Sequence, residues 1–326
     1  MGTRTAGLLL AGIIVTRASA CMFSKLLLAG MGPFTLMALR FGIVSALLAL
    51  LFGGKLVRAD RATIRRGAAI GALFFIVMSL ETMALCYSAS STVCFLENTA
   101  IVLVPLLEAA HARRAPRIRD IACTLAVLAG VGLLTLQEGI SGFGTGEALS
   151  LAAAVFYALA IMVTARAARA HDSLTLGVLQ VGVMGIASPI AAFALESPAL
   201  PGGGMEWLYL AVLVFVCTGF GFTLQPVAQR YLSAEQAGIF CALNPLTAGI
   251  CGTLFLAEPL GSARLAGMAL VLLGIMVASL KKPDPENPLR QSAAESNVPP
   301  SPPAVKSLEG TLIKGKRGEG GSGAWA

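Results

Sequence analysis

Charge is what this sequence has least of. Lysine, arginine, aspartate and glutamate make up 13% of its 326 residues, whereas soluble proteins carry about a quarter. Apolar residues reach 56% and the mean hydropathy is +0.80. These values exclude an ordinary soluble domain and indicate an integral membrane protein. The apolar stretches run to about 20 residues, which favours helices over the ten-residue alternating strands of a barrel.

Histidine and nucleotide-binding motifs are nearly absent as well. The two histidines, His111 and His171, fall in expected loops, and no cluster has metal-ligand spacing. No phosphate-cradling P-loop is present, so direct use of ATP is not expected. We therefore expect no metal and no cofactor. The net charge of +7 comes from loops and tail and requires no nucleic-acid partner.

What is present is a series of apolar segments. They predict an all-α integral membrane protein with ten transmembrane helices at residues 6–29, 33–53, 67–87, 92–110, 121–137, 147–167, 173–195, 207–228, 234–256 and 265–281. Residues 283–326 are rich in Pro, Ser and Gly and are expected to form a disordered cytoplasmic tail.

Basic residues are distributed unevenly between the two sets of loops. One set has only Arg264; the other carries Lys55, Arg58, Arg61, Arg65, Arg66, Arg113, Arg114, Arg117, Arg119, Arg166, Arg169, Arg230, Lys281 and Lys282. Short loops rich in lysine and arginine lie on the cytoplasmic side of the membrane. The bias predicts a multi-pass protein of the cell (inner) membrane with both termini cytoplasmic.

A weak internal repeat divides the chain. With an offset of 140, GPFTLMALRF at 32–41 aligns with DSLTLGVLQV at 172–181, so Arg40 corresponds to Gln180 and Arg17 to Tyr157. Each half, 1–139 and 140–282, holds five expected helices. Because five is odd, the second half must enter the membrane from the opposite side, which predicts two inverted five-helix repeats.

Several stretches carry a family resemblance: SKLLLAGMGPFTLMALRF, then SAEQAG leading into LNPLTAGICGTLFLAEPLG, and the closing GMALVLLGIMVAS. They resemble an EamA-type member of the drug/metabolite transporter superfamily. The resemblance implies ten helices in two inverted repeats around a central cavity, with export of amino acids or other small metabolites as a common activity. In the first half, Ala100 stands where the family has a proline.

Charged residues inside the expected spans mark the candidate site. Arg40, Glu81 and Glu97 each lie five to seven residues from the outer ends of their helices, roughly 8–10 Å deep. Charges facing lipid are costly, so these side chains are expected to point inward. Either they form a structural ion-pair network, or they bind a zwitterion, with Arg40 holding a carboxylate and Glu81 or Glu97 an ammonium group.

The remaining candidates lie deeper or in the second half. Arg17 is near the middle of the first span, and with Tyr157 it either lines a cavity or belongs to a buried ion pair. Gln180 and Asn244 either orient a ligand or join helices by hydrogen bonds. Pro245 leaves a carbonyl one turn earlier without its helical donor. Pro245 and Pro226 are candidate hinges, with a harmless kink as the alternative.

These features favour a secondary transporter, most simply an exporter, moving amino acids or similar small polar metabolites by alternating access. The expected partners are a small-molecule substrate and the lipid bilayer; the monomer is the expected functional unit, and proton coupling is an open alternative. The alternatives are a multidrug or other-metabolite carrier of the same fold and a membrane-embedded enzyme acting on a lipid-linked substrate. We do not expect an enzyme, because both histidines fall in loops and no His/Asp/Glu cluster has metal spacing. An ion channel would need a ring of like groups, which the sequence lacks.

Overall fold

The computed structural model describes residues 3–111, 113, 115, 121–122, 125–126, 129–130, 133, 143–230, 247, 250–251, 253–255 and 261–279. The described helices all belong to one compact unit, residues 1–281. The expected disordered tail, residues 283–326, lies outside the described residues.

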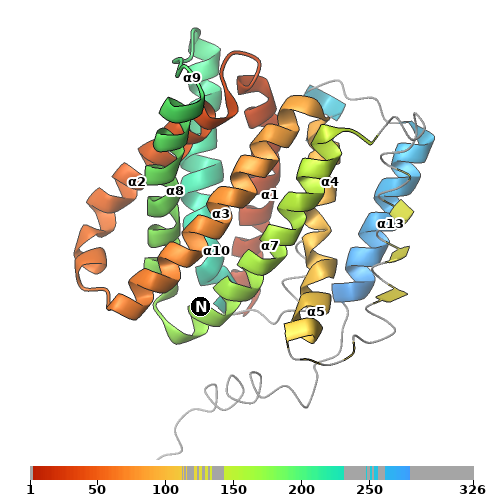
Figure 1. Cartoon of the computed structure of the whole chain (residues 1–326), viewed down its shortest axis with the longest axis horizontal. Coiled ribbons are helices and arrows are strands. Elements are labelled where there is room, and N and C mark those ends of the chain that lie inside the picture. Colours follow the sequence, from red (N-terminus) through yellow and green to blue (C-terminus); the bar gives the residue numbers. More distant parts are fainter. Residues whose placement is uncertain are drawn as a thin grey trace, which may run out of the picture. The chain divides into compact units, whose positions relative to one another are not determined.

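The described part of the chain is helical and contains no strand, which confirms the all-α prediction for these residues. The elements, shown in Figure 1, are α1 (Thr3–Leu27), α2 (Pro33–Val57), α3 (Arg61–Tyr87), α4 (Ser90–Asn98), α5 (Ala100–His111), α7 (Thr145–Ala170), α8 (Ser173–Leu195), α9 (Gly204–Ala211), η2 (Val212–Phe220), α10 (Gly221–Arg230) and α13 (Ser262–Ser279).

Six described stretches are long and apolar enough to cross a membrane: 33–57, 61–87, 90–111, 145–168, 173–195 and 204–224. Each coincides with an expected span. Helices α1 and α13 occupy the places of the first and last expected spans without counting among the six. Most of the expected spans 121–137 and 234–256 lies outside the described residues.

Two of the expected continuous helices are irregular. The span at 92–110 is divided at Thr99 into α4 and α5. Here the Asn98 amide donates to the Cys94 carbonyl at 2.7 Å and the Thr99 hydroxyl to the Leu96 carbonyl at 2.7 Å. Such side-chain bonds compete with the helical backbone and bend it. In the span at 207–228, residues 212–220 widen into a π-helix, η2.

Helices α3 and α8 both start with an aspartate cap. Asp60 accepts from the amides of Ala62 and Thr63 at the start of α3, and Asp172 accepts from the Thr175 amide at the start of α8. A carboxylate at this place satisfies amides that have no helical acceptor.

Helix α2 takes its cap from the other half of the chain. Its own N-cap position is Gly32, which has no side-chain cap. Glu196, at the end of α8, instead accepts from the amides of Phe34 at 2.9 Å and Thr35 at 2.8 Å. One end of α2 is thereby fixed to one end of α8.

Glycines allow the helices around α8 to approach closely. A Cβ atom on Gly71 of α3 would lie 2.7 Å from the Cβ of Val183, and one on Gly177 of α8 would lie 2.7 Å from the carbonyl oxygen of Thr223. Small residues at such contacts are typical of membrane helix packing. Among the described elements, α8 packs most extensively against α2, and α3 packs against both α7 and α8.

Contacts between the halves come in equivalent pairs. The repeat offset maps α1 onto α7, α2 onto α8, and α3 onto the stretch α9–η2–α10. Helix α3 packs on α7 just as η2 and α10 pack on α1, and α3 packs on α8 just as η2 packs on α2. This is the pattern that two-fold-related halves produce.

Candidate functional site

Arg17 on α1 reaches across to the second half. Its Nη1 donates to the hydroxyl of Tyr157 on α7 at 3.1 Å. Its guanidinium carbon lies 4.5 Å from the ring centre of Phe222 and 5.5 Å from that of Tyr157. Gly221 makes room for this side chain, since a Cβ there would be 3.0 Å from the Arg17 Cγ. Two residues that the repeat equates, Arg17 and Tyr157, are thus in contact.

Arg40 on α2 approaches the same ring from another helix. Its side chain is 4% exposed, and its Nε donates to the hydroxyl of Thr218 on η2. Its guanidinium carbon lies 5.0 Å from the ring centre of Phe41 and 5.8 Å from that of Phe222. Both arginines are therefore within cation–π range of Phe222.

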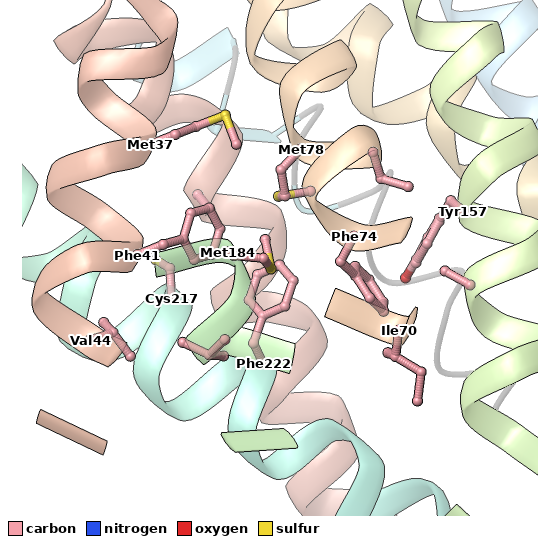
Figure 2. Packing of buried hydrophobic residues seen from close by; sticks show 14 of the residues in the cluster. Met37, Phe41, Val44, Ile70, Phe74, Met78, Tyr157, Met184, Cys217 and Phe222 are labelled. Carbon is pink, nitrogen blue, oxygen red and sulfur yellow. The ribbon is translucent and has the colours of Figure 1, made fainter. Parts of the chain in front are cut away.

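Phe222 also belongs to a row of buried rings. Its ring centre is 5.7 Å from that of Phe41 and 5.8 Å from that of Phe74, both in edge-to-face geometry, and Phe74 lies 6.0 Å from Tyr157. Figure 2 shows Phe41, Phe222, Phe74 and Tyr157 in this order across α2, α10, α3 and α7. We call these four residues the aromatic row.

The wide turn of η2 and a proline position Phe222 and Thr218. Within η2, the Thr218 hydroxyl donates to the carbonyl of Leu213, five residues earlier, at 2.8 Å. Pro226 has no N–H to offer the Phe222 carbonyl, its i−4 acceptor in α10. The amide of Gln180 on α8 donates to that carbonyl at 3.5 Å. Gln180 thus compensates for the donor that proline removes.

Two carboxyl groups complete the cluster. Glu81 on α3 is 8% exposed and Glu97 on α4 is 5% exposed. Their carboxyl groups lie close enough for each to act on the charge of the other, and the Cys21 thiol donates to the Glu81 Oε1 at 3.3 Å. Among the described residues, Arg40 forms no ion pair with either carboxyl group, although it is close enough for its charge to act on both. The charge of Arg17 also reaches both.

The structure brings most of the predicted site residues together. Arg17, Arg40, Tyr157 and Gln180 meet around Phe222, while Glu81 and Glu97 form the adjoining carboxyl pair. Pro226 lies within α10, whose helix continues through it to Arg230. The predicted residues Asn244 and Pro245 lie outside the described residues.

Sequence reasoning missed three members of the cluster: Cys21, Thr218 and Phe222. Cys21 follows Arg17 by four residues, so both lie on one side of α1. Thr218 and Phe222 flank the segment Gly-Phe-Gly at 219–221, where two glycines in an apolar run signal close backbone approach. The four-residue spacing of Arg17 and Cys21 and the Gly-Phe-Gly segment are the features of the sequence from which these residues could have been predicted.

Polar contacts beside the α2–α3 and α7–α8 turns also join the two halves of the chain. Lys55 lies 3.9 Å from the carboxylate of Asp172, and the Thr63 hydroxyl lies 2.8 Å from the His171 Nδ1. The Thr63 hydroxyl also donates to Asp60 and lowers the pKa of that carboxyl group. A hydrogen bond from the Thr175 hydroxyl likewise lowers the pKa of Asp172.

The cluster can bind both signs of charge. Two guanidinium groups present donors suited to a carboxylate, two carboxyl groups suit an ammonium group, and the aromatic row offers apolar surface. The described residues hold no group of three or more His, Cys, Asp or Glu side chains able to bind a metal ion. Both signs of charge and an apolar surface thus lie within one buried cluster.

Known proteins are similar to this chain in sequence and in fold. Two uncharacterized transporters of Archaeoglobus fulgidus are similar: one is 27% identical over 79% of this chain and 80% of its own length, the other 24% identical over 45% and 53%. A solved crystal structure matches with a TM-score of 0.64 and 20% identity, covering 85% of this chain and 97% of the other, which shows a shared fold. The model of the EamA-like transporter family matches twice, at residues 5–136 and 144–280, and the chain therefore belongs to the EamA-like transporter family.

Proposed function

We propose that this protein is a secondary transporter that exports amino acids or similar small polar metabolites by alternating access. The observation that carries the proposal is the approach of Arg17 and Arg40 to one buried ring, Phe222, with both guanidinium groups close enough for their charges to act on Glu81 and Glu97. Membership of a transporter family supports movement of a solute, and the paired opposite charges support a zwitterionic one.

In this proposal the arginines hold the substrate carboxylate and the pair Glu81–Glu97 holds its ammonium group. Tyr157 and Thr218 already receive hydrogen bonds from the arginines, so they position the guanidinium groups. Gln180 supports the backbone of α10. Asn244 stays a candidate ligand, and bending at Pro226 and Pro245 stays the predicted hinge movement.

Counterflow into liposomes tests the solute class. Purified protein is reconstituted in liposomes loaded with one unlabelled L-amino acid, and uptake of its labelled form is followed. We expect exchange above that of protein-free liposomes, unchanged in Glu206→Gln, which alters a carboxylate at the start of α9, away from the cluster. Failure of all twenty amino acids to exchange would reject this solute class.

Growth of an overexpressing strain tests the direction of transport. An exporter should raise resistance to toxic amino-acid analogues in proportion to the protein level. Greater sensitivity would indicate uptake instead of export.

The orientation is part of the proposal. We propose that the protein lies in the inner membrane with both termini in the cytoplasm, and the bias of Lys and Arg between the loops supports this orientation. We also propose that the monomer is the functional unit. Single cysteines at Ser141 and Ser197, in a background without native cysteines, should react with an impermeant reagent from outside. Labelling at both sites only after membrane permeabilisation would show that the orientation is the opposite of the proposed one.

A further inference from the structure

The terminal edge of Arg40 is free of hydrogen bonds. This buried side chain uses its Nε to donate to the Thr218 hydroxyl, and its terminal nitrogens, Nη1 and Nη2, have no hydrogen-bond partner among the described residues. Neither nitrogen is fully buried, because the fully buried side-chain atoms without a partner, in the described part of the chain, are the hydroxyl oxygens of Thr164, Ser188 and Thr223. Arg40 therefore presents both terminal nitrogens to accessible space inside an otherwise buried site.

These two nitrogens are enough for one carboxylate. In a guanidinium group, Nη1 and Nη2 donate in parallel directions and pair with both oxygens of a single carboxylate. The rings of Phe41 and Phe222, whose centres lie 5.0 and 5.8 Å from the guanidinium carbon, hold Arg40 in place without using its donors. Each oxygen of a carboxylate at this edge already accepts a charged hydrogen bond, so that carboxylate does not require a second arginine.

Arg17 is a second guanidinium group, and other helices hold it. It extends from α1, donates through Nη1 to the Tyr157 hydroxyl on α7 at 3.1 Å, and lies 4.5 Å from the ring centre of Phe222. Because Arg40 lies 5.8 Å from the same ring centre, the two guanidinium carbons cannot be farther apart than the sum of these distances. Aspartate and glutamate carry two carboxylates on a short carbon chain, which can reach both groups within this limit.

The contacts that hold the two arginines do not cancel their charges. The hydroxyls of Thr218 and Tyr157 and the ring of Phe222 are all uncharged. A positive charge in a buried site is stabilised best by an anion that also accepts its hydrogen bonds. An amino acid with a neutral side chain brings one carboxylate to two guanidinium groups, whereas an acidic amino acid brings two.

We propose that the substrate is an acidic amino acid, aspartate or glutamate, with one carboxylate on the terminal edge of Arg40 and the other on Arg17. The inference rests on the proposed function, which makes the solute an amino acid and places its ammonium group beside Glu81 and Glu97. Phe222 contacts both carboxylate-binding groups and limits their spacing. Arg17 is accordingly the residue that distinguishes acidic amino acids from their amides.

Counterflow with matched acids and amides tests this specificity in the wild type. Liposomes containing the purified protein are loaded with aspartate, asparagine, glutamate or glutamine, and uptake of the same labelled solute is followed at neutral pH. The members of each pair differ by one negative charge. We expect the half-saturating concentration of each acid to be about 10- to 100-fold lower than that of its amide, the range of a charged hydrogen bond. Equal values, or a lower value for the amide, would overturn the inference.

Variants of Arg17 test the role given to this residue. In Arg17→Gln the ratio between amide and acid should fall to about one, because the second carboxylate has lost its partner. Arg17→Lys keeps the charge without the planar fork and should keep part of the preference. Arg65→Gln makes the same change at an exposed position of α3 and should keep the wild-type ratio. A wild-type ratio in Arg17→Gln, shown to be folded by its unfolding temperature, would remove Arg17 from the substrate site.

Failure of this inference can be told apart from failure of the proposed function. Exchange of neutral amino acids without exchange of aspartate or glutamate refutes the inference alone. Should none of the twenty exchange, the amino-acid class fails, and glutarate and its mono-amide test the two carboxylate-binding groups directly. A larger rise in unfolding temperature with glutarate, lost in Arg17→Gln, would support two binding groups. An equal rise with both compounds, or no rise with either, would refute them.

Discussion

The two halves of the chain contribute different chemistry to one cluster. The charged residues Arg17, Arg40, Glu81 and Glu97 all belong to the first half, whereas the second half contributes uncharged polar and aromatic groups, namely Tyr157, Gln180, Thr218 and Phe222. Among the described residues the packing of the helices repeats between the halves, but the charged members of the cluster do not. The two halves are therefore not chemically equivalent at the cluster, although their helices are arranged alike.

The largest expected effect comes from making the halves alike at one position. Arg40→Gln copies the residue found at Gln180. If Arg40 holds a substrate carboxylate, the variant stays folded and its affinity for amino acids falls by about 30- to 150-fold, the loss of a charged hydrogen bond of about 2–3 kcal/mol. Uptake and the unfolding temperature measure the two properties.

The double variant Arg40→Gln with Glu81→Gln separates this role from a structural one. If Arg40 only balances the carboxyl pair, the single change destabilises the protein by about 3–5 kcal/mol and the second change restores stability. Recovery of both stability and uptake in the double variant would remove Arg40 from the substrate site.

Phe222→Leu tests how much the second half contributes to the stability of the cluster. The change removes a ring that both arginines approach, together with its contacts to Phe41 and Phe74. We expect the free energy of unfolding to fall by about 2–3 kcal/mol. Phe220→Leu is the matched control, because that side chain is 37% exposed. An equal loss in both variants would show that the arginine contacts contribute nothing.

A pair of glycines on α8 tests the close packing of the second half. Gly177→Ala places a methyl group against the Thr223 carbonyl and should cost about 1–3 kcal/mol. Gly182→Ala meets nothing within 4 Å and should stabilise the helix by up to about 1 kcal/mol. Chemical unfolding measures both, and a loss in the second variant as large as in the first would contradict the packing.

The smallest effect concerns acid stability at a helix cap of the first half. Hydrogen bonding lowers the pKa of Asp60 in the folded state, so its contribution is present above the unfolded pKa and is lost as the pH falls through the folded one. Asp60→Asn should therefore lose less thermal stability than the wild type between about pH 6 and pH 3. An unfolding temperature that falls equally with pH in both proteins would show that the Asp60 cap does not titrate.

The sequence predicts those parts of the site that depend on helix periodicity and repeat offset. The offset of 140 pairs Arg17 with Tyr157, and the structure joins them by a hydrogen bond of 3.1 Å. Counting residues from the loops puts Glu81 and Glu97 at one depth, and in the structure both are buried and close enough for their charges to interact.

Other features depend on packing that one sequence does not record. The π-helix at 212–220 changes the register of a whole span, yet its residues are ordinary apolar ones plus a threonine and a glycine. The division at Thr99 also occurs without the proline that the family resemblance led us to look for at the next position. At Thr99 the bonds from Asn98 and Thr99 to the preceding turn accompany the division, but such residues also occur within regular helices, so the sequence alone does not single out this position.

The cap that Glu196 gives to α2 sets an order of events during biosynthesis. The first amides of α2 lack a partner until a residue about 160 positions later has been made and inserted. Helix α2 therefore enters the membrane with its leading end unfinished, and that end is completed only when α8 arrives. A nascent chain halted before residue 196 would hold an α2 that frays at this end, so this end of the first half becomes stable only once α8 has been inserted.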